Sequence, residues 1–217
     1  MRRIVITGCG GGLGEALMDE ARDSGHTVFP HYRRSDESGV LTGSLTDYSF
    51  NDKFNEYMQI HNVDTFINNA GQYLGGSIED YSDHSIKHLI DTNITAQILL
   101  LKTAYKRFKR MGGGLIVNIN SLAFQQPSAN ETIYCATKFA LKGFSKALQI
   151  EAIGTGVEII DVHPGGIKTR MTENRNGFDT MMNREEVASQ VIGLIYRNSN
   201  YMNEIVLRKR NHESGRS

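Results

Sequence analysis

The sequence contains little cysteine, with Cys9 and Cys135 as the only two among 217 residues. Two thiols are too few for a disulfide framework or a cysteine-rich metal site, so we expect no bound metal. A chain without a disulfide framework is typical of a reducing compartment. The low cysteine content therefore predicts an intracellular protein.

Long apolar segments are also absent. The longest aliphatic run, residues 98–101, is far shorter than the roughly 18 residues that a membrane-spanning helix needs. After Met1, Arg2 and Arg3 the chain is apolar only from Ile4 to Ile6, which is too short for the apolar core of a signal peptide. We therefore expect a cytoplasmic protein that does not associate with membranes.

The charge is balanced, because 24 lysines and arginines face 24 aspartates and glutamates. Nucleic-acid-binding proteins usually carry a basic excess or a basic stripe. The balance predicts that nucleic acid is not a partner.

Short apolar runs alternate with longer amphipathic segments along the whole chain. The runs are residues 4–6, 27–29, 64–67, 115–119, 157–160 and 205–207, and helical patterns include residues 15–24, 86–111, 133–152 and 184–197. This alternation predicts an α/β fold, with a parallel sheet covered by helices on both faces. With no repeat and no linker, we expect a single domain over residues 1–217, with a frayed polar tail at 208–217.

Two features fit the predicted sheet less well. The sequence pattern of the third strand is weak, and Pro30 is unfavourable in an inner strand.

A glycine cluster follows the first apolar run and precedes the first helical pattern. It reads Thr7-Gly8-Cys9-Gly10-Gly11-Gly12-Leu13-Gly14. Glycines at this place allow a tight turn and the close approach of a pyrophosphate, which binds the N-terminal N–H groups of the helix. The alternative is a flexible glycine turn, which the position between strand and helix disfavours.

The end of the second strand bears on the choice between NAD and NADP. Folds that prefer NAD usually offer a carboxylate there to the ribose 2′-hydroxyl, but this chain has Tyr32, followed by Arg33 and Arg34. Two arginines favour a 2′-phosphate, through charge-assisted hydrogen bonds. They would otherwise be two solvated surface residues.

Tyr134 and Lys138 are four residues apart in a helical segment, which places both on one face. A nearby cation favours tyrosinate and so lowers the pKa of a tyrosine that exchanges protons. Ser121 follows the apolar run 115–119, at the edge where open α/β sheets bind ligands. Taken alone, the pair would be an ordinary helix pair and the serine a helix cap or turn former.

These motifs together resemble the classical branch of the short-chain dehydrogenase/reductase family. Gly8, Gly12 and Gly14 form its TGxxxGxG pattern, and Ser121 precedes Tyr134 by 13 residues. Asn68-Asn69-Ala70-Gly71 is similar to its NNAG element, and the segment from Pro164 to Thr169 is similar to its PGxxxT element. The resemblance spans residues 4–207. It implies a Rossmann-type doubly wound domain with a seven-stranded parallel sheet.

The resemblance implies an NADP-dependent oxidoreductase that transfers hydride between NADPH and a carbonyl or alcohol substrate. Tyr134 would exchange the proton, Ser121 would stabilise the substrate oxygen, Lys138 would hold the nicotinamide ribose and lower the pKa of Tyr134, and Asn93 would hold a water. The implied cofactor-binding residues are Thr7, Gly8, Gly12, Leu13, Gly14, Arg33, Arg34, Leu45, Asn69, Ala70, Gly71, Tyr134, Lys138, Pro164, Gly165, Ile167 and Thr169. Relatives pack the helices expected at 86–111 and 133–152 against a second copy, which implies a homodimer or homotetramer.

Some features depart from the family or leave a choice open. Ser44 stands where members often have an adenine-contacting Asp, and the glycine-rich C-terminal stretch is missing. Asn93 would otherwise be a polar residue on a solvated helix face, and His163 is expected to be structural. The segment 172–183 is expected to form a substrate lid, but it does not identify the substrate. A non-catalytic NADP-binding sensor with the same fold is the alternative function.

Overall fold

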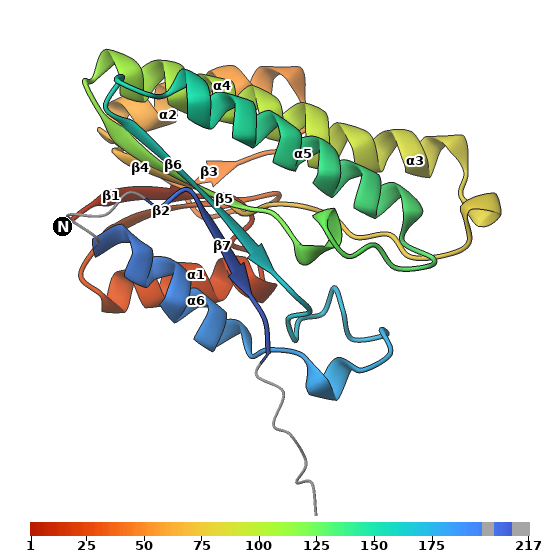
Figure 1. Cartoon of the computed structure of the whole chain (residues 1–217). Helices are drawn as coiled ribbons and strands as arrows, with labels where there is room; N and C mark the ends of the chain where they lie inside the picture. Colours follow the sequence, from red (N-terminus) through yellow and green to blue (C-terminus); the bar gives the residue numbers. More distant parts are fainter. Residues whose placement is uncertain (197–201, 210–217) are drawn as a thin grey trace, which may run out of the picture.

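The computed structural model describes residues 1–196 and 202–209. Seven parallel strands form one sheet in the order β3-β2-β1-β4-β5-β6-β7 (Figure 1). The strands are β1 (Arg3–Ile6), β2 (Thr27–Tyr32), β3 (Leu41–Thr42), β4 (Thr65–Asn68), β5 (Gly114–Ile119), β6 (Val157–Pro164) and β7 (Glu204–Leu207). The α/β doubly wound fold with a seven-stranded parallel sheet is therefore confirmed.

Helices cover both faces of the sheet. They are α1 (Gly12–Asp23), α2 (Tyr48–Ile60), α3 (Asp83–Ile90), α4 (Ala96–Arg110), α5 (Thr132–Glu151) and α6 (Arg184–Gly193). Helices α1 and α6 lie on one face, and α2, α4 and α5 lie on the other (Figure 1). Each face has its own apolar core, because the central strands bury side chains on both sides.

Short helical turns complete the chain. The 3₁₀ turns are Ile78–Asp80, Leu122–Phe124, Phe178–Thr180 and Leu194–Tyr196, and a π-helical turn spans Asp91–Thr95. Among the residues that the structure describes, no helix is long and apolar enough to span a membrane.

The strand order reverses between β1 and β4. The chain runs from β1 outward through β2 to β3, then returns to β4 on the other side of β1. Crossovers leave in opposite directions at such a point, and a crevice opens outside the carboxyl ends of the two strands. The glycine cluster after β1 and the Asn69-Ala70-Gly71 segment after β4 border this crevice.

Pro30 lies in the inner strand β2 without interrupting it. The carbonyl of His31 accepts a hydrogen bond from Cys9 N–H on the β1 side, and that of Tyr32 accepts one from Gly43 N–H on the β3 side. Backbone groups of successive residues in a strand face alternate sides, so the nitrogen of Pro30 faces β3, as the carbonyl of Tyr32 does. Strand β3 pairs only with His31 and Tyr32, so no partner is lost at Pro30.

Several element boundaries differ from those expected. The helix expected at 86–111 is two helices, α3 and α4, joined by the π turn Asp91–Thr95. The helical pattern at 184–197 ends as α6 at Gly193 and continues as a 3₁₀ turn to Tyr196. Arg197 and the predicted tail beyond Lys209 lie outside the described residues. Helix α2, which the sequence analysis did not identify, covers β3.

Candidate active site

The glycine cluster forms a tight loop between β1 and α1. Gly8 has φ of 78° and Gly12 has φ of 60°, both in the left-handed region that favours glycine. A Cβ on Gly14 would lie 2.1 Å from the carbonyl oxygen of Gly8, so any side chain there would collide with the loop backbone. The loop therefore depends on glycine at these positions, and its backbone borders the crevice.

Thr7 holds the loop against the end of β4. Its Oγ1 accepts hydrogen bonds from the N–H groups of Asn69 and Ala70, at 3.0 and 3.1 Å. Nδ2 of Asn69 donates to the carbonyl of Thr7 at 2.9 Å. Thr7 is fully buried and does not border the crevice. Its hydrogen bonds hold Asn69 and Ala70 in place, and these two residues line the crevice.

His31, which the sequence analysis passed over, joins the glycine loop to the segment after β3. Its Nδ1 accepts a hydrogen bond from Gly8 N–H at 3.2 Å, and its Nε2 lies 3.0 Å from the carbonyl oxygen of Gly43. These partners require Nδ1 to accept and Nε2–H to donate, which defines one neutral tautomer. Burial lowers the pKa of His31, which favours the same neutral form.

The two arginines after β2 differ in position. Both are exposed, but Arg33 lines the crevice and Arg34 does not. Leu45 and Ser44, on the segment after β3, lie on the same wall as Arg33. The structure therefore brings only one of the two predicted arginines to this end of the crevice.

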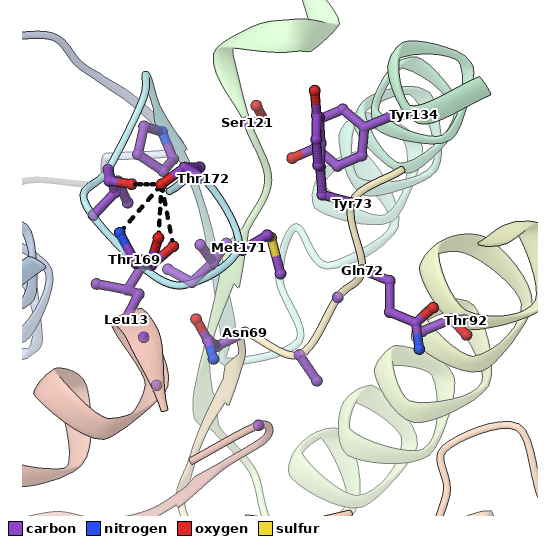
Figure 2. A pocket seen from close by; sticks show the side chains of 18 of the residues that line it. Leu13, Asn69, Gln72, Tyr73, Thr92, Ser121, Tyr134, Thr169, Met171 and Thr172 are labelled. Atoms are coloured by element: carbon purple, nitrogen blue, oxygen red, sulfur yellow. Dashed lines mark hydrogen bonds between the residues drawn. The ribbon is translucent and has the colours of Figure 1, made fainter. Parts of the chain in front are cut away.

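Ser121 and Tyr134 face one another across the other end (Figure 2). Ser121 follows β5 and caps the turn Leu122–Phe124, where its Oγ accepts a hydrogen bond from Ala123 N–H at 3.1 Å. Burial raises the pKa of Tyr134, and a hydrogen bond with Ser121 acts in the opposite direction. Burial of the phenol is the largest influence, and a lower pKa through Lys138 and a bound oxidised nicotinamide stays a prediction.

Lys138 lies one turn beyond Tyr134 on α5, with its Nζ 5.6 Å from the centre of the tyrosine ring. Burial lowers the pKa of Lys138 to about 8. A Cβ built on Gly71 would lie 4.0 Å from this Nζ and 3.5 Å from Oδ1 of Asn93, so both side chains approach the backbone at Gly71.

Asn93 is buried within the π turn, at 1 % exposure, so it does not lie on a solvated helix face. Its Oδ1 accepts from Gln72 N–H, and its Nδ2 donates to the carbonyl of Gln72, both at 2.8 Å. Nδ2 also lies 3.3 Å from Oγ1 of Thr137 on α5. Asn93 therefore fastens the segment after β4 to the helix that carries Tyr134 and Lys138, without lining the crevice.

The segment after β6 forms another wall of the crevice. Thr172 Oγ1 accepts from Thr169 N–H at 3.1 Å, a contact drawn in Figure 2, and it donates to the carbonyl of Ile167. A Cβ on Gly12 would lie 3.4 Å from Cγ2 of Thr169, so this loop packs against the glycine loop. Thr172 is a buried residue that the motif comparison did not single out.

Three side chains close the crevice above Tyr134. The Tyr73 ring packs edge-on against the Tyr134 ring, with centres 5.2 Å apart (Figure 2). The hydroxyl of Tyr73 donates to Oε1 of Glu131 at 3.0 Å, and Arg175 forms an ion pair with the same oxygen. Burial, together with the bond to Glu131, raises the pKa of Tyr73 to about 12. No sequence motif marks this cluster.

These walls enclose one crevice of about 990 Å³. Its lining contains most of the predicted site, namely Gly8, Gly12, Leu13, Gly14, Arg33, Leu45, Asn69, Ala70, Gly71, Ser121, Tyr134, Lys138, Pro164, Gly165, Ile167 and Thr169. Thr7, Arg34 and Asn93 are the predicted residues that do not line it. A dinucleotide fits this set, because the crevice borders the glycine loop and the N-terminus of α1 and also contains the Ser121–Tyr134 pair.

His163 and the two cysteines are not placed for proton transfer or nucleophilic attack. His163 is fully buried, and burial lowers its pKa to about 4, so it is neutral as a structural histidine. Cys9 is buried, and burial raises its pKa to about 12. Cys135 is buried beside Tyr134. Among the described residues, no group of three or more potential metal ligands is present.

Comparison with known proteins places this geometry in context. The sequence profile of the short chain dehydrogenase family matches residues 2–179. An uncharacterised oxidoreductase of Staphylococcus aureus is 28% identical over 220 residues, which cover 94% of this chain and 95% of the relative.

Solved structures share the fold. A short-chain dehydrogenase from Sphingobium yanoikuyae in complex with NADPH has a TM-score of 0.82 at 25% identity, over 95% of this chain and 87% of the other. The 3-ketoacyl-(acyl-carrier-protein) reductase of Brucella melitensis, complexed with NADH, has a TM-score of 0.86 at 19% identity, over 95% and 96% of the two chains. The profile match covers most of the chain, and the chain therefore belongs to the short-chain dehydrogenase family of oxidoreductases.

Proposed function

We propose that this oxidoreductase uses NADP and transfers hydride between NADPH and a carbonyl or alcohol substrate. The observation that carries the proposal is that Ser121, Tyr134 and Lys138 line the same crevice as the glycine loop. A phosphate-binding loop and an acid–base group at opposite ends of one crevice are what hydride transfer from a dinucleotide requires.

The preference for NADP rests on the charge after β2. Arg33 lines the crevice, and Tyr32 occupies the position at which NAD-preferring folds usually have a carboxylate. The two solved structures described above were obtained with NADPH and with NADH, so fold likeness alone favours neither. The guanidinium of Arg33 can pair with a 2′-phosphate, and we propose this as its role.

The other wall residues are proposed to hold the rest of the cofactor. The N-terminal N–H groups of α1 would bind the pyrophosphate at Gly12 and Leu13. Leu45 and Ala70 would border the adenosine, while Thr169 and Ile167 would bind the nicotinamide amide. Lys138 would hydrogen-bond the nicotinamide ribose. Thr7 would act indirectly, by fixing Asn69 and Ala70.

When bound, NADPH supplies hydride to the carbonyl carbon of the substrate. Tyr134 donates its phenolic proton to the carbonyl oxygen, so that the alcohol forms and the phenol is left as tyrosinate. Ser121 donates a hydrogen bond to the same oxygen while negative charge develops on it. The ammonium of Lys138 stabilises the tyrosinate, and a water held near Asn93 would return the proton. Alcohol oxidation runs the same steps in reverse.

A non-catalytic NADP-binding sensor is the second candidate function. It would keep the glycine loop but would not need Ser121 and Tyr134 to face one another. The presence of that pair favours the enzyme.

The test measures the dissociation constants of NADPH and NADH by fluorescence titration. We expect NADPH to bind more tightly, because only its 2′-phosphate can pair with Arg33. Arg33→Ala should weaken NADPH and leave NADH nearly unchanged. Arg34→Ala removes an equal charge from a side chain that does not line the crevice, and it should change neither constant. Equal affinities for the two cofactors in the wild-type protein would contradict the proposal.

A further inference from the structure

The cluster above Tyr134 contains a cation with unused hydrogen-bond donors. Arg175 lies on the segment expected to be the lid, and its guanidinium lies 5.0 Å from the centre of the Tyr73 ring. In the described part of the chain, only Nη2 of its guanidinium makes a hydrogen bond, to Oε1 of Glu131. Nε and Nη1 therefore keep free N–H groups on a side chain that lines the crevice.

Glu131 positions this guanidinium. Its side chain is 8 % exposed, against 30 % for Arg175, and one of its oxygens already accepts from both Tyr73 and Arg175. Both residues line the crevice, but Oε1 of the mostly buried carboxylate is engaged, and the guanidinium is the more exposed partner of the pair. The two edges of a guanidinium that can bind a carboxylate with two hydrogen bonds pair Nη2 with Nε or with Nη1. The contact with Glu131 uses one N–H of Nη2, so its second N–H and the neighbouring donor remain to match the two oxygens of a carboxylate.

The other charges of the crevice support an anion at this end. The lining contains the basic residues Arg33, Lys138, Arg170, Arg175 and Arg184 and the acidic residues Glu15 and Glu131. Glu15 pairs with Arg184 at 2.6 Å beside the glycine loop, and Arg33 lies at the end proposed for the 2′-phosphate. Burial raises the pKa of Tyr134, while the nearby charges of Arg175 and Glu131 act on it in opposite directions, Arg175 lowering it and Glu131 raising it.

We propose that Arg175 binds the carboxylate of the substrate, so that the enzyme acts on a short oxo acid or on the corresponding hydroxy acid. This inference rests on the proposed function, because the carbonyl is placed between Ser121 and Tyr134. Tyr73 separates Arg175 from Tyr134, with 5.0 Å from guanidinium to ring and 5.2 Å between the two rings. The distance between Arg175 and Tyr134 sets the number of bonds between carboxylate and carbonyl, and a series of oxo acids of increasing length measures that number. The reaction converts the oxo acid, hydride from NADPH and one proton from Tyr134 into the hydroxy acid and NADP.

The experiment compares acids with their neutral amides. Three pairs serve as substrates: pyruvate with pyruvamide, acetoacetate with acetoacetamide, and levulinate with levulinamide. In each pair a neutral amide replaces the negatively charged carboxylate. The three acids place that carboxylate at three distances from the ketone. NADPH oxidation gives kcat/KM for each. The wild-type enzyme should prefer the acid in at least one pair by about tenfold or more, as for hydrogen bonds to a charged group.

Arg175→Met should remove this preference by lowering kcat/KM for the acid while leaving the amide within about threefold. Arg175→Lys keeps the charge but loses the fork, so it should retain part of the preference. Lys168→Met is the matched control, since it removes a cation from the neighbouring loop without touching the crevice, and it should behave as the wild type. Circular dichroism and the NADPH dissociation constant establish that each variant is folded.

Other results would overturn the inference. If Arg175→Met slows acid and amide equally, the Arg175–Glu131 pair only fastens the lid. If the wild type prefers no acid, or prefers the cationic ketone aminoacetone, then Arg175 is not a carboxylate site. If the proposed function itself is wrong, the result is different, because neither the acids nor the amides would then cause NADPH oxidation.

Discussion

Lys138 and Tyr134 lie one turn apart on α5, with the lysine ammonium 5.6 Å from the centre of the tyrosine ring. Lys138 is 7 % exposed, and no ion pair to it is found among the described residues. Burial therefore lowers its pKa from 10.5 to about 8. The fold holds this cation at a cost in stability, and the cation borders the crevice in which the proposed reaction takes place.

This cost makes the stability of the protein depend on pH. Between pH 8 and 10.5 the unfolded chain keeps a proton on Lys138 that the folded chain has lost, so the free energy of unfolding should rise with pH. The rise from this group should be at most about 3 kcal/mol. Lys138→Met should therefore be more stable than the wild type at pH 7, and the difference should shrink toward pH 10.5. Urea unfolding at several pH values measures it. Lys106→Met removes an exposed lysine from α4 and should have the same stability as the wild type at each pH. If the difference in stability between Lys138→Met and the wild type does not depend on pH, the expectation is refuted.

Gly14 should tolerate no side chain. Its Cβ would lie 2.1 Å from the Gly8 carbonyl oxygen and 2.7 Å from Nδ2 of Asn69, which would force the loop out of position. Gly14→Ala should lower the free energy of unfolding by about 2 kcal/mol or more, in the range of overpacking, and should abolish NADPH binding. Gly143→Ala is the control, because that glycine lies within α5 with no atom within 4 Å of the added Cβ. It should raise stability by about 0.5–1 kcal/mol. Normal NADPH affinity in Gly14→Ala would show that the loop is not packed as described.

His31 should make cofactor binding sensitive to acid. Because burial lowers its pKa below 6.5, the unfolded chain takes up this proton first as pH falls, and stability is lost below about pH 6.5. Protonation would also remove the acceptor for Gly8 N–H. His31→Phe should weaken NADPH binding at pH 7.5 and reduce the loss of stability between pH 6.5 and 5. His31→Gln, which can accept and donate at the two ends, should retain more affinity. NADPH titrations and thermal melts over this pH range test both variants. If His31→Phe and His31→Gln behave identically, the hydrogen bonds of His31 to Gly8 and Gly43 do not contribute to cofactor binding.

The sequence predicted those parts of the site whose role is set by local structure. The glycine loop needs only a strand before it and a helix after it, and Tyr134 and Lys138 share a face by helical spacing alone. His31 and Arg175 could not be identified in this way, because their partners lie in segments that only the folded chain brings together. Thr172 has partners only three and five residues away, Thr169 and Ile167, but no motif marks it. Asn93 was identified by resemblance, but its burial depends on the π turn and on Gln72.

Assembly was predicted from the helices expected at 86–111 and 133–152, which relatives pack against a second copy. On these helices Leu100, Leu101, Leu141 and Leu148 lie in the core against the sheet. Phe139 and Ile150 on α5 are exposed instead, at 51 % and 69 %. We still expect a homodimer or homotetramer that covers them. Light scattering at micromolar concentration should give a multiple of the 24.2 kDa chain mass, and Phe139→Ser with Ile150→Ser should reduce it. A monomer mass for the wild type would exclude this assembly.

The central claim, that Tyr134 gives its proton to the substrate oxygen, is tested by Tyr134→Phe. The change removes one hydroxyl from a ring packed against Tyr73, so folding and the NADPH dissociation constant should stay as in the wild type. NADPH oxidation should nevertheless fall by at least about a hundredfold, the low end for losing a positioned acid–base group. Ser121→Ala should also slow the reaction without changing the affinity for NADPH. The decisive measurement is kcat for Tyr134→Phe with saturating NADPH and the preferred carbonyl compound: a loss of about a hundredfold or more is the predicted result, and near-normal turnover would contradict it.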